Sequence, residues 1–97
     1  MSARTVRWTR RALRRVEQIG DHIAAEDPAA AARVVARVFT AVEALAAQPA
    51  MGRTGRIGGT RELVLADFPY VIAYRVTAET VDILTVLHGA QRWPDAL

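Results

Sequence analysis

The sequence predicts an α+β domain with the element order βααβββ, in which an N-terminal strand and a helical hairpin pack on a mainly antiparallel, twisted sheet. Apolar residues recur at helical spacing in two blocks of the N-terminal half and at strand spacing in three blocks of the C-terminal half. A glycine-rich segment separates the halves. With 97 residues, 52% of them hydrophobic, the chain is expected to form a single domain over residues 1–97.

The first elements are a short strand and a helix. Arg4 to Trp8 has the composition of a strand, and Thr9 is a suitable N-cap for the helix that follows. The apolar side of this helix is predicted to comprise Ala12, Leu13, Val16, Ile19, Gly20 and Ile23.

Basic residues crowd the first turns of that helix. They are Arg10, Arg11, Arg14 and Arg15. Positive charge at a helix N-terminus opposes the helix dipole and costs some stability. The cluster is therefore either a solvated helix face or a docking surface for an acidic partner.

A second helix follows a clear break. Asp27 is expected to cap it, and Pro28 suits its first turn, where a missing N–H costs little. The helix is predicted to run to about Ala47, with Pro49 beyond its end, and to form an αα-hairpin with the first helix. Its predicted buried stripe is Ala31, Val34, Val35, Val38, Val42 and Leu45.

Met51 to Thr60 is a loop with four glycines in ten residues. It lacks the GK[ST] ending of a P-loop and the GxGxxG pattern of a dinucleotide site. We interpret it as a flexible connector that carries Arg53 and Arg56.

Three strands are predicted at Arg61 to Leu65, Tyr70 to Val76 and Val81 to His88. The second and third are apolar on both faces over much of their length, which is typical of central strands covered on both sides. Strict alternation places Tyr70, Ile72, Tyr74 and Val76 on one face of the second strand. In the third strand it places one set on one face, Val81, Ile83, Thr85 and Leu87, and the other set on the opposite face, Asp82, Leu84, Val86 and His88. Glu62 is expected to pair across the sheet with an arginine such as Arg75.

Composition argues against several kinds of site. There are no cysteines and only two histidines, so neither a disulfide, a metal site nor a cofactor site is expected. No apolar run approaches the roughly 20 residues of a membrane span, and the basic N-terminus lacks the apolar stretch of a signal peptide. A cytoplasmic protein without a membrane partner is therefore expected.

The charge points to an acidic partner. All 13 basic residues are arginine, the net charge is +3 and the pI is about 10.5. Arginine offers a flat, permanently charged fork that suits phosphate and carboxylate groups. Nucleic acid and an acidic protein are both compatible with this charge.

The segment GTRELVLADFPYVIAYRVTAETVDILTVLHGAQRWP resembles the RelE/ParE superfamily of toxins from bacterial type II toxin–antitoxin modules. The pattern R-E-[LI]-V, P-Y-x-[IV]-x-Y-R-V and V-[DE]-I-[LI]-x-V-[LI]-H is similar to the ParE branch. LAAQPAMGR is also similar to that branch, with Gln48 where its members often carry histidine. The resemblance implies a cognate acidic antitoxin encoded in the same operon, a toxin–antitoxin hetero-oligomer and growth arrest as the outcome.

The expected chemistry depends on whether the chain resembles the RelE branch or the ParE branch of the superfamily. RelE-like members are ribosome-dependent endoribonucleases that cut messenger RNA, and they carry an arginine in a Y-R-L-V-Y motif where this chain has Val71. This chain has no lysine either, so a ribonuclease would depend on His88, Arg61, Arg92 and Tyr70. ParE-like members resemble inhibitors of DNA gyrase, which act through a binding surface. The resemblance thus favours a gyrase inhibitor without catalytic residues, with a ribonuclease and a non-toxic, antitoxin-binding remnant as alternatives.

The residues expected to bind the target or the antitoxin are Arg10, Arg11, Arg14, Arg53, Arg56, Arg61, Arg92 and Trp93. Trp93 either covers the sheet edge or an apolar patch, or stacks on a base. His88 is either a structural residue bonded to nearby backbone or a functional imidazole.

Overall fold

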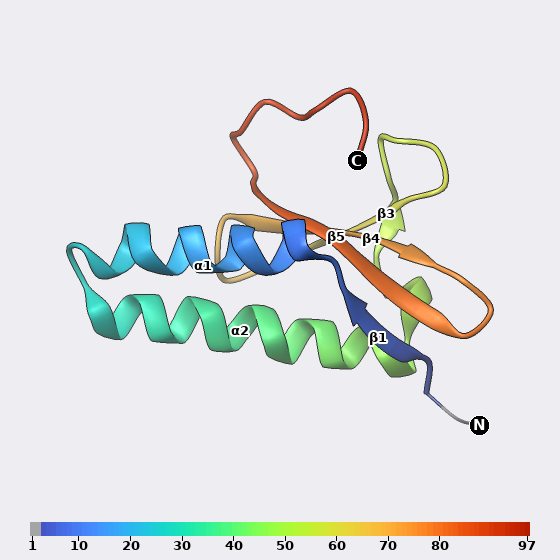
Figure 1. Cartoon of the computed structure of the whole chain (residues 1–97), viewed down its shortest axis with the longest axis horizontal. Helices are drawn as coiled ribbons and strands as arrows, with labels where there is room; N and C mark the ends of the chain where they lie inside the picture. The colour runs from blue at the N-terminus through green and yellow to red at the C-terminus, as the bar shows by residue number, and fades with distance from the viewer. Residues whose placement is uncertain (1–2) are drawn as a thin grey trace.

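A five-stranded sheet forms the centre of the fold in the computed structural model, which describes residues 3–97 (Figure 1). In chain order the elements are β1 (Thr5–Trp8), α1 (Arg10–Ala24), α2 (Pro28–Ala47), the short 3₁₀ helix η1 (Pro49–Met51), β2 (Arg53–Thr54), β3 (Arg61–Val64), β4 (Tyr70–Val76) and β5 (Thr80–His88). The strands lie in the order β1-β5-β4-β3-β2. Only the β1–β5 pair is parallel, so the predicted α+β class and the mainly antiparallel sheet are confirmed.

The helical hairpin covers one face of the sheet (Figure 1). Thr9 caps α1 by accepting a hydrogen bond from the Ala12 N–H at 3.1 Å, and Asp27 caps α2 by accepting one from the Ala30 N–H at 3.0 Å. Both caps are the ones that the sequence predicts. The Thr9 hydroxyl also donates to the Ile83 carbonyl at 2.8 Å, so the start of α1 is fixed to β5.

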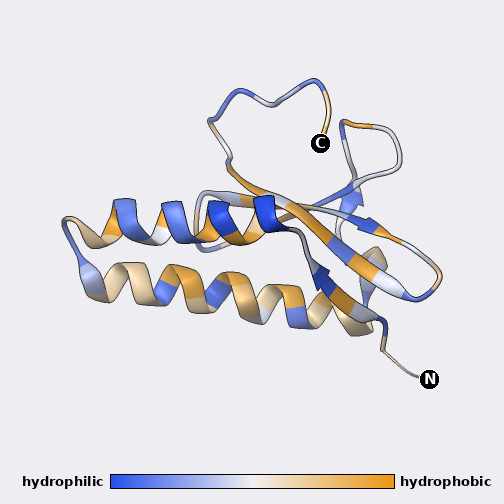
Figure 2. Ribbon diagram, viewed as in Figure 1, coloured by the Kyte–Doolittle hydropathy of each residue, from blue (hydrophilic) through white to orange (hydrophobic). Residues whose placement is uncertain are grey.

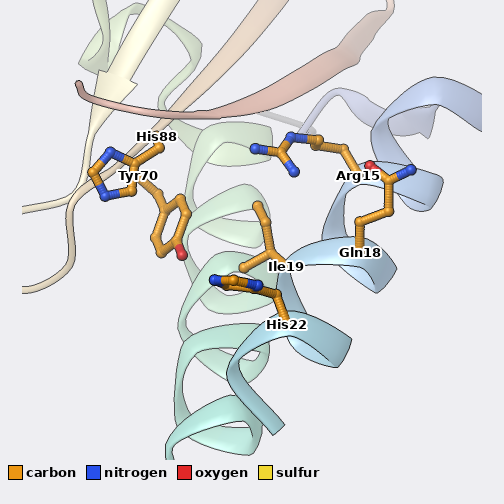
Figure 3. Close-up of a pocket in the computed structure, with 6 residues that line it drawn as sticks. All are labelled: Arg15, Gln18, Ile19, His22, Tyr70 and His88. Carbon is orange, nitrogen blue, oxygen red and sulfur yellow. The ribbon is translucent and has the colours of Figure 1, made fainter. Parts of the chain in front are cut away.

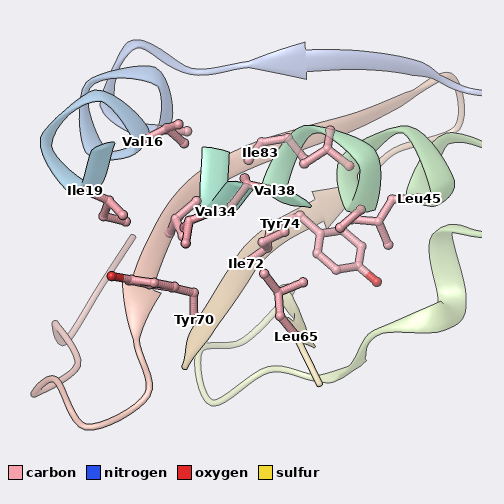
Figure 4. Close-up of a cluster of buried hydrophobic side chains, with 14 of the residues drawn as sticks. Val16, Ile19, Val34, Val38, Leu45, Leu65, Tyr70, Ile72, Tyr74 and Ile83 are labelled. Carbon is pink, nitrogen blue, oxygen red and sulfur yellow. The ribbon is translucent and has the colours of Figure 1, made fainter. Parts of the chain in front are cut away.

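The hydrophobic core lies between the helices and the sheet (Figure 4). Tyr70, Ile72 and Tyr74 of β4 point into it, as the alternation predicts. They meet an apolar stripe from the helices that includes Val16, Ile19, Val34, Val38 and Leu45. The burial of these side chains is the main stabilising contribution to the fold.

Leu13 departs from the predicted stripe, since its side chain is 46% exposed. The buried positions of α1 are Ala12, Val16 and Ile19. Leu13 lies one residue, and hence about 100°, around the helix from Ala12. It therefore lies among the arginines of a helix end that is strongly hydrophilic (Figure 2).

An irregularity between β4 and β5 changes which residues of β5 share a face. Ala73 pairs with Thr85 whereas Tyr74 pairs with Ile83, so Leu84 has no direct partner. A bulge of this kind inserts one residue and reverses the alternation beyond it. Val81, Ile83 and Val86 all join the core, which corrects the strict alternation expected from the sequence.

Candidate functional site

The sheet face away from the helices, hereafter the outer face, is apolar at its centre. Val71 and Ala73 alternate with the core residues of β4, and Val71 is paired with Leu87 on one side and Val64 on the other. Val71, Ala73 and Leu87 are buried, while Val64 is 49% exposed. The position that carries arginine in the ribonuclease relatives therefore lies within an apolar surface.

The segment after β5 and the loop between β2 and β3 extend on the side of the sheet away from the helices (Figure 1). A cavity of about 390 Å³ lies where this C-terminal segment meets β5 and the start of α1. It is lined by Arg11, Leu87, Gln91, Arg92, Trp93, Pro94 and Asp95. Three of the predicted binding residues, Arg11, Arg92 and Trp93, thus come together here.

Trp93 joins the C-terminal segment to the β2–β3 loop. The Arg56 guanidinium lies over its ring, 4.0 Å from the ring centre, which is a cation–π contact. Trp93 also lines the cavity beside Leu87. Trp93 thus lies between the β2–β3 loop and the outer-face cavity.

The buried carboxylate of Glu62 binds both Arg53 and Arg56. Its carboxylate accepts hydrogen bonds from the Arg53 guanidinium at 3.0 Å and from the Arg56 backbone N–H at 2.7 Å, and the Arg56 guanidinium lies 3.6 Å away. Burial alone would raise the pKa of Glu62, but these bonds and charges outweigh it and the pKa is lowered. Arg53 and Arg56 therefore both form ion pairs with Glu62 of the same chain.

The expected cross-strand pairing of Glu62 with an arginine is confirmed, but the partner is Arg53 and not Arg75. Arg53 of β2 lies directly opposite Glu62 in the sheet register, whereas Arg75 lies opposite Asp82 of β5. The two-residue strand β2 is absent from the predicted element order. Because β2 is not predicted from the sequence, Arg53 could not be recognised as the cation beside Glu62 on the side away from β4.

The residues proposed for a ribonuclease do not form one site. Tyr70 pairs with His88 at one end of β4, and Arg61 pairs with Tyr74 four residues further along, which is roughly 13 Å in a strand. The Arg61 guanidinium donates to the Gly52 carbonyl at 2.8 Å. Arg92 lies in the outer-face cavity.

His88 and Tyr70 lie on the helix side of the sheet. Their rings meet edge to face at a centroid distance of 5.5 Å, and the Ala90 N–H donates to His88 Nδ1 at 3.1 Å. The structural role anticipated for His88 is thus present. Because alternate residues of a strand point to opposite faces, His88 and Tyr70 lie across the sheet from Val71.

Tyr70 and His88 also line a cavity of about 310 Å³ with residues that the sequence analysis did not select as a group (Figure 3). These are Arg15, Gln18, Ile19 and His22 of α1. Arg15, Gln18 and His22 have i, i+3, i+7 spacing, which puts them on one side of a helix. That spacing is visible in the sequence and is the signal that could have found them.

Arg10, Arg11 and Arg14 form an exposed basic surface at the start of α1, with Leu13 among them; we call these four residues the α1 surface. The ion pairs within residues 3–97 involve Arg7, Arg37, Arg53 and Arg56, and none includes the α1 surface. Its charge is consequently available to a partner.

Residues 3–97 contain no group of three or more histidine, cysteine or acidic side chains placed to hold a metal ion. No helix in this part of the chain is both long and apolar enough to span a membrane.

The sequence is similar to known toxins over its length. Residues 6–93 match the family model described as the ParE toxin of the type II toxin–antitoxin system parDE. Y4kP, a candidate toxin of Sinorhizobium fredii, is 61% identical over 97 residues, covering 100% of both chains. The toxin RelE2 of Caulobacter vibrioides is 41% identical over 84 residues, which cover 87% of this chain and 93% of that one.

Solved structures show the same relationship. A chain of the chromosomal ParDE toxin–antitoxin system from P. aeruginosa has a TM-score of 0.81 at 27% identity, covering 89% of this chain and 96% of that one. A chain of the RelBE2 toxin–antitoxin complex from Mycobacterium tuberculosis has a TM-score of 0.68 at 27% identity, with 89% and 98% covered. The E. coli toxin RelE in the free state, 13% identical with a TM-score of 0.66 and 93% and 86% covered, shares the fold. The chain therefore belongs to the ParE toxin family of type II toxin–antitoxin systems, within the RelE/ParE superfamily.

Proposed function

We propose that this toxin acts by binding DNA gyrase rather than by cutting RNA, and that a cognate acidic antitoxin neutralises it. The observation that carries the proposal is the burial of Val71 within the outer face, with Tyr70 and His88 on the opposite side of the sheet. Beside Val71, the exposed Val64 offers an apolar contact, and Arg11 and Arg92 lie at the periphery for a protein partner.

Ribonuclease chemistry makes a stricter demand on geometry. Cleavage by the 2′-hydroxyl needs cations at the phosphate and a group that moves protons within hydrogen-bond reach of the same atoms. Among the four nuclease candidates, Arg61 is bonded to Gly52 and lies at the far end of β4 from the Tyr70–His88 pair. This separation favours inhibition by binding.

The α1 surface is the region that we assign to the antitoxin. It combines three exposed arginines with Leu13, so it offers both charge and an apolar contact to an acidic, amphipathic segment. Such a segment would also relieve the repulsion between these arginines and the helix dipole. The ParDE and RelBE2 structures are of toxin–antitoxin systems, and this supports an antitoxin partner here.

Replacing the one histidine among the nuclease candidates tests the absence of catalysis. We expect His88→Ala to arrest growth as strongly as the parent toxin when each is induced without antitoxin. The substitution removes an imidazole whose Nδ1 accepts only a local bond from Ala90. Loss of growth arrest by a variant that is folded and still binds antitoxin would contradict the proposal.

A further inference from the structure

The cavity between α1 and the ends of β4 and β5 combines several hydrogen-bond donors with a lining free of acidic side chains. Its volume is about 310 Å³, and its lining residues are Arg15, Gln18, Ile19, His22, Tyr70 and His88. We propose that it binds a phosphoryl group. This site is separate from the gyrase and antitoxin surfaces proposed above and does not depend on them.

Two hydrogen bonds fix the Arg15 guanidinium and leave other N–H groups for an anion. Its Nε donates to the Val86 carbonyl at 3.1 Å and one Nη donates to Gln91 Oε1 at 2.9 Å. These bonds use two of the five N–H groups of a guanidinium and fix its plane, so the remaining N–H groups stay available. Arg15 takes part in none of the ion pairs within residues 3–97.

Tyr70 provides a hydroxyl in a fixed position. Tyr70 is 9% exposed, and its ring packs edge to face on His88, which restricts the direction of the hydroxyl. The hydroxyl points toward His22 and Ile19 (Figure 3), and it makes no hydrogen bond within the described part of the chain. A bound oxyanion would give it an acceptor.

The imidazoles add donors on two sides of the cavity. His88 Nδ1 accepts from the Ala90 N–H, so its proton is on Nε2, which is then a donor. His22 and Gln18 come from successive turns of α1, on the same side as Arg15. Arg15, His22 and Tyr70 line the cavity together, so their donor groups can contact different oxygens of a tetrahedral anion.

The lining of the cavity includes one cation, Arg15, and no acidic side chain, which favours an anion. Glu17 and Asp21 neighbour its residues along α1, and Glu26 and Asp27 line a separate depression that His22 shares. None of these acids lines the cavity itself. A cation entering it would meet Arg15 without any carboxylate ligand.

A titration with inorganic phosphate tests the proposal. The chain has only two histidines, and both line the cavity, so their imidazole NMR signals report on it directly. We expect both signals to shift saturably with phosphate at constant ionic strength. Tyr70→Phe and His22→Ala, each of which removes a donor group, should weaken binding by roughly three- to tenfold.

Arg33→Gln is the control for binding that is only electrostatic, because Arg33 is exposed on α2 and its loss lowers the net charge by one without changing the cavity. It should leave the affinity unchanged. Adenosine monophosphate then distinguishes a nucleotide phosphate from free phosphate as the ligand. If it binds more tightly than phosphate and the same residues are affected, the site is assigned to a nucleotide phosphate. Equal binding assigns the site to the free ion. The proposal is overturned if the shifts do not saturate, or if Tyr70→Phe and His22→Ala bind phosphate as the parent does.

Discussion

Glu62 is the residue on which the β2–β3 region depends most. It is 1% exposed, yet it is ionised and bonded to Arg53 and to the backbone of Arg56. Arg56 continues to Trp93, so one buried carboxylate connects β3 through the loop to the C-terminal segment. A buried charge is tolerated here because every partner is in place.

Stability should accordingly depend on the ionisation of Glu62. Since its folded-state pKa is lowered from the ordinary value of 4.5, its contribution is present at neutral pH and is lost as pH falls through the folded-state pKa. We expect Glu62→Gln to lower the free energy of unfolding by about 1–3 kcal/mol at pH 7. The difference from the parent should shrink in acid, as measured by urea unfolding at several pH values.

Glu43→Gln is the control, because Glu43 is exposed on α2 and forms no ion pair within residues 3–97. It should unfold like the parent at every pH. A Glu62→Gln variant whose deficit is the same at pH 7 and in acid would show that the carboxylate charge contributes nothing.

At the scale of elements, the sequence predicts what depends on local pattern and misses what depends on neighbours. Both helix caps follow from Thr9 and Asp27 alone, and they are confirmed. The strand β2 is only two residues long and exists because Arg53 lies opposite Glu62. The bulge at Leu84 likewise depends on the partner strand, so alternation within β5 could not reveal it.

The candidate surfaces, too, are predicted where they depend on local sequence and missed where they depend on tertiary contacts. The basic cluster of α1 is visible in the sequence, but the exposure of Leu13 is decided by the angle at which α1 packs on the sheet. The contact of Arg56 with Trp93 joins positions 37 residues apart along the chain (93 − 56). No local pattern predicts a contact of that range.

The start of α1 should show a conflict between stability and binding. Reversing the charge with Arg11→Glu places a carboxylate at the helix N-terminus, so we expect the free energy of unfolding to rise by about 0.3–1 kcal/mol. The same change should weaken binding to the antitoxin, measured by calorimetry with the protein encoded beside the toxin. Arg33→Glu on α2 is the control and should change the affinity little. Unchanged affinity of Arg11→Glu would exclude this residue from the antitoxin interface.

At the scale of the molecule, the sheet separates two surfaces with different chemistry. The outer face is apolar at Val71 and Leu87 and bears arginines at its periphery. The helix side holds the core and, at one end, the cavity of Tyr70 and His88. The residues that a nuclease of this chain would need are divided between these surfaces, and this division favours inhibition by binding.

The most direct test of that assignment compares two assays of the same purified toxin. One measures DNA supercoiling by gyrase, and the other measures the integrity of messenger RNA during translation in a cell-free extract. We expect supercoiling to be inhibited while the messenger RNA stays intact, and added antitoxin to reverse the inhibition. Cleaved messenger RNA with unimpaired supercoiling would contradict inhibition by gyrase binding.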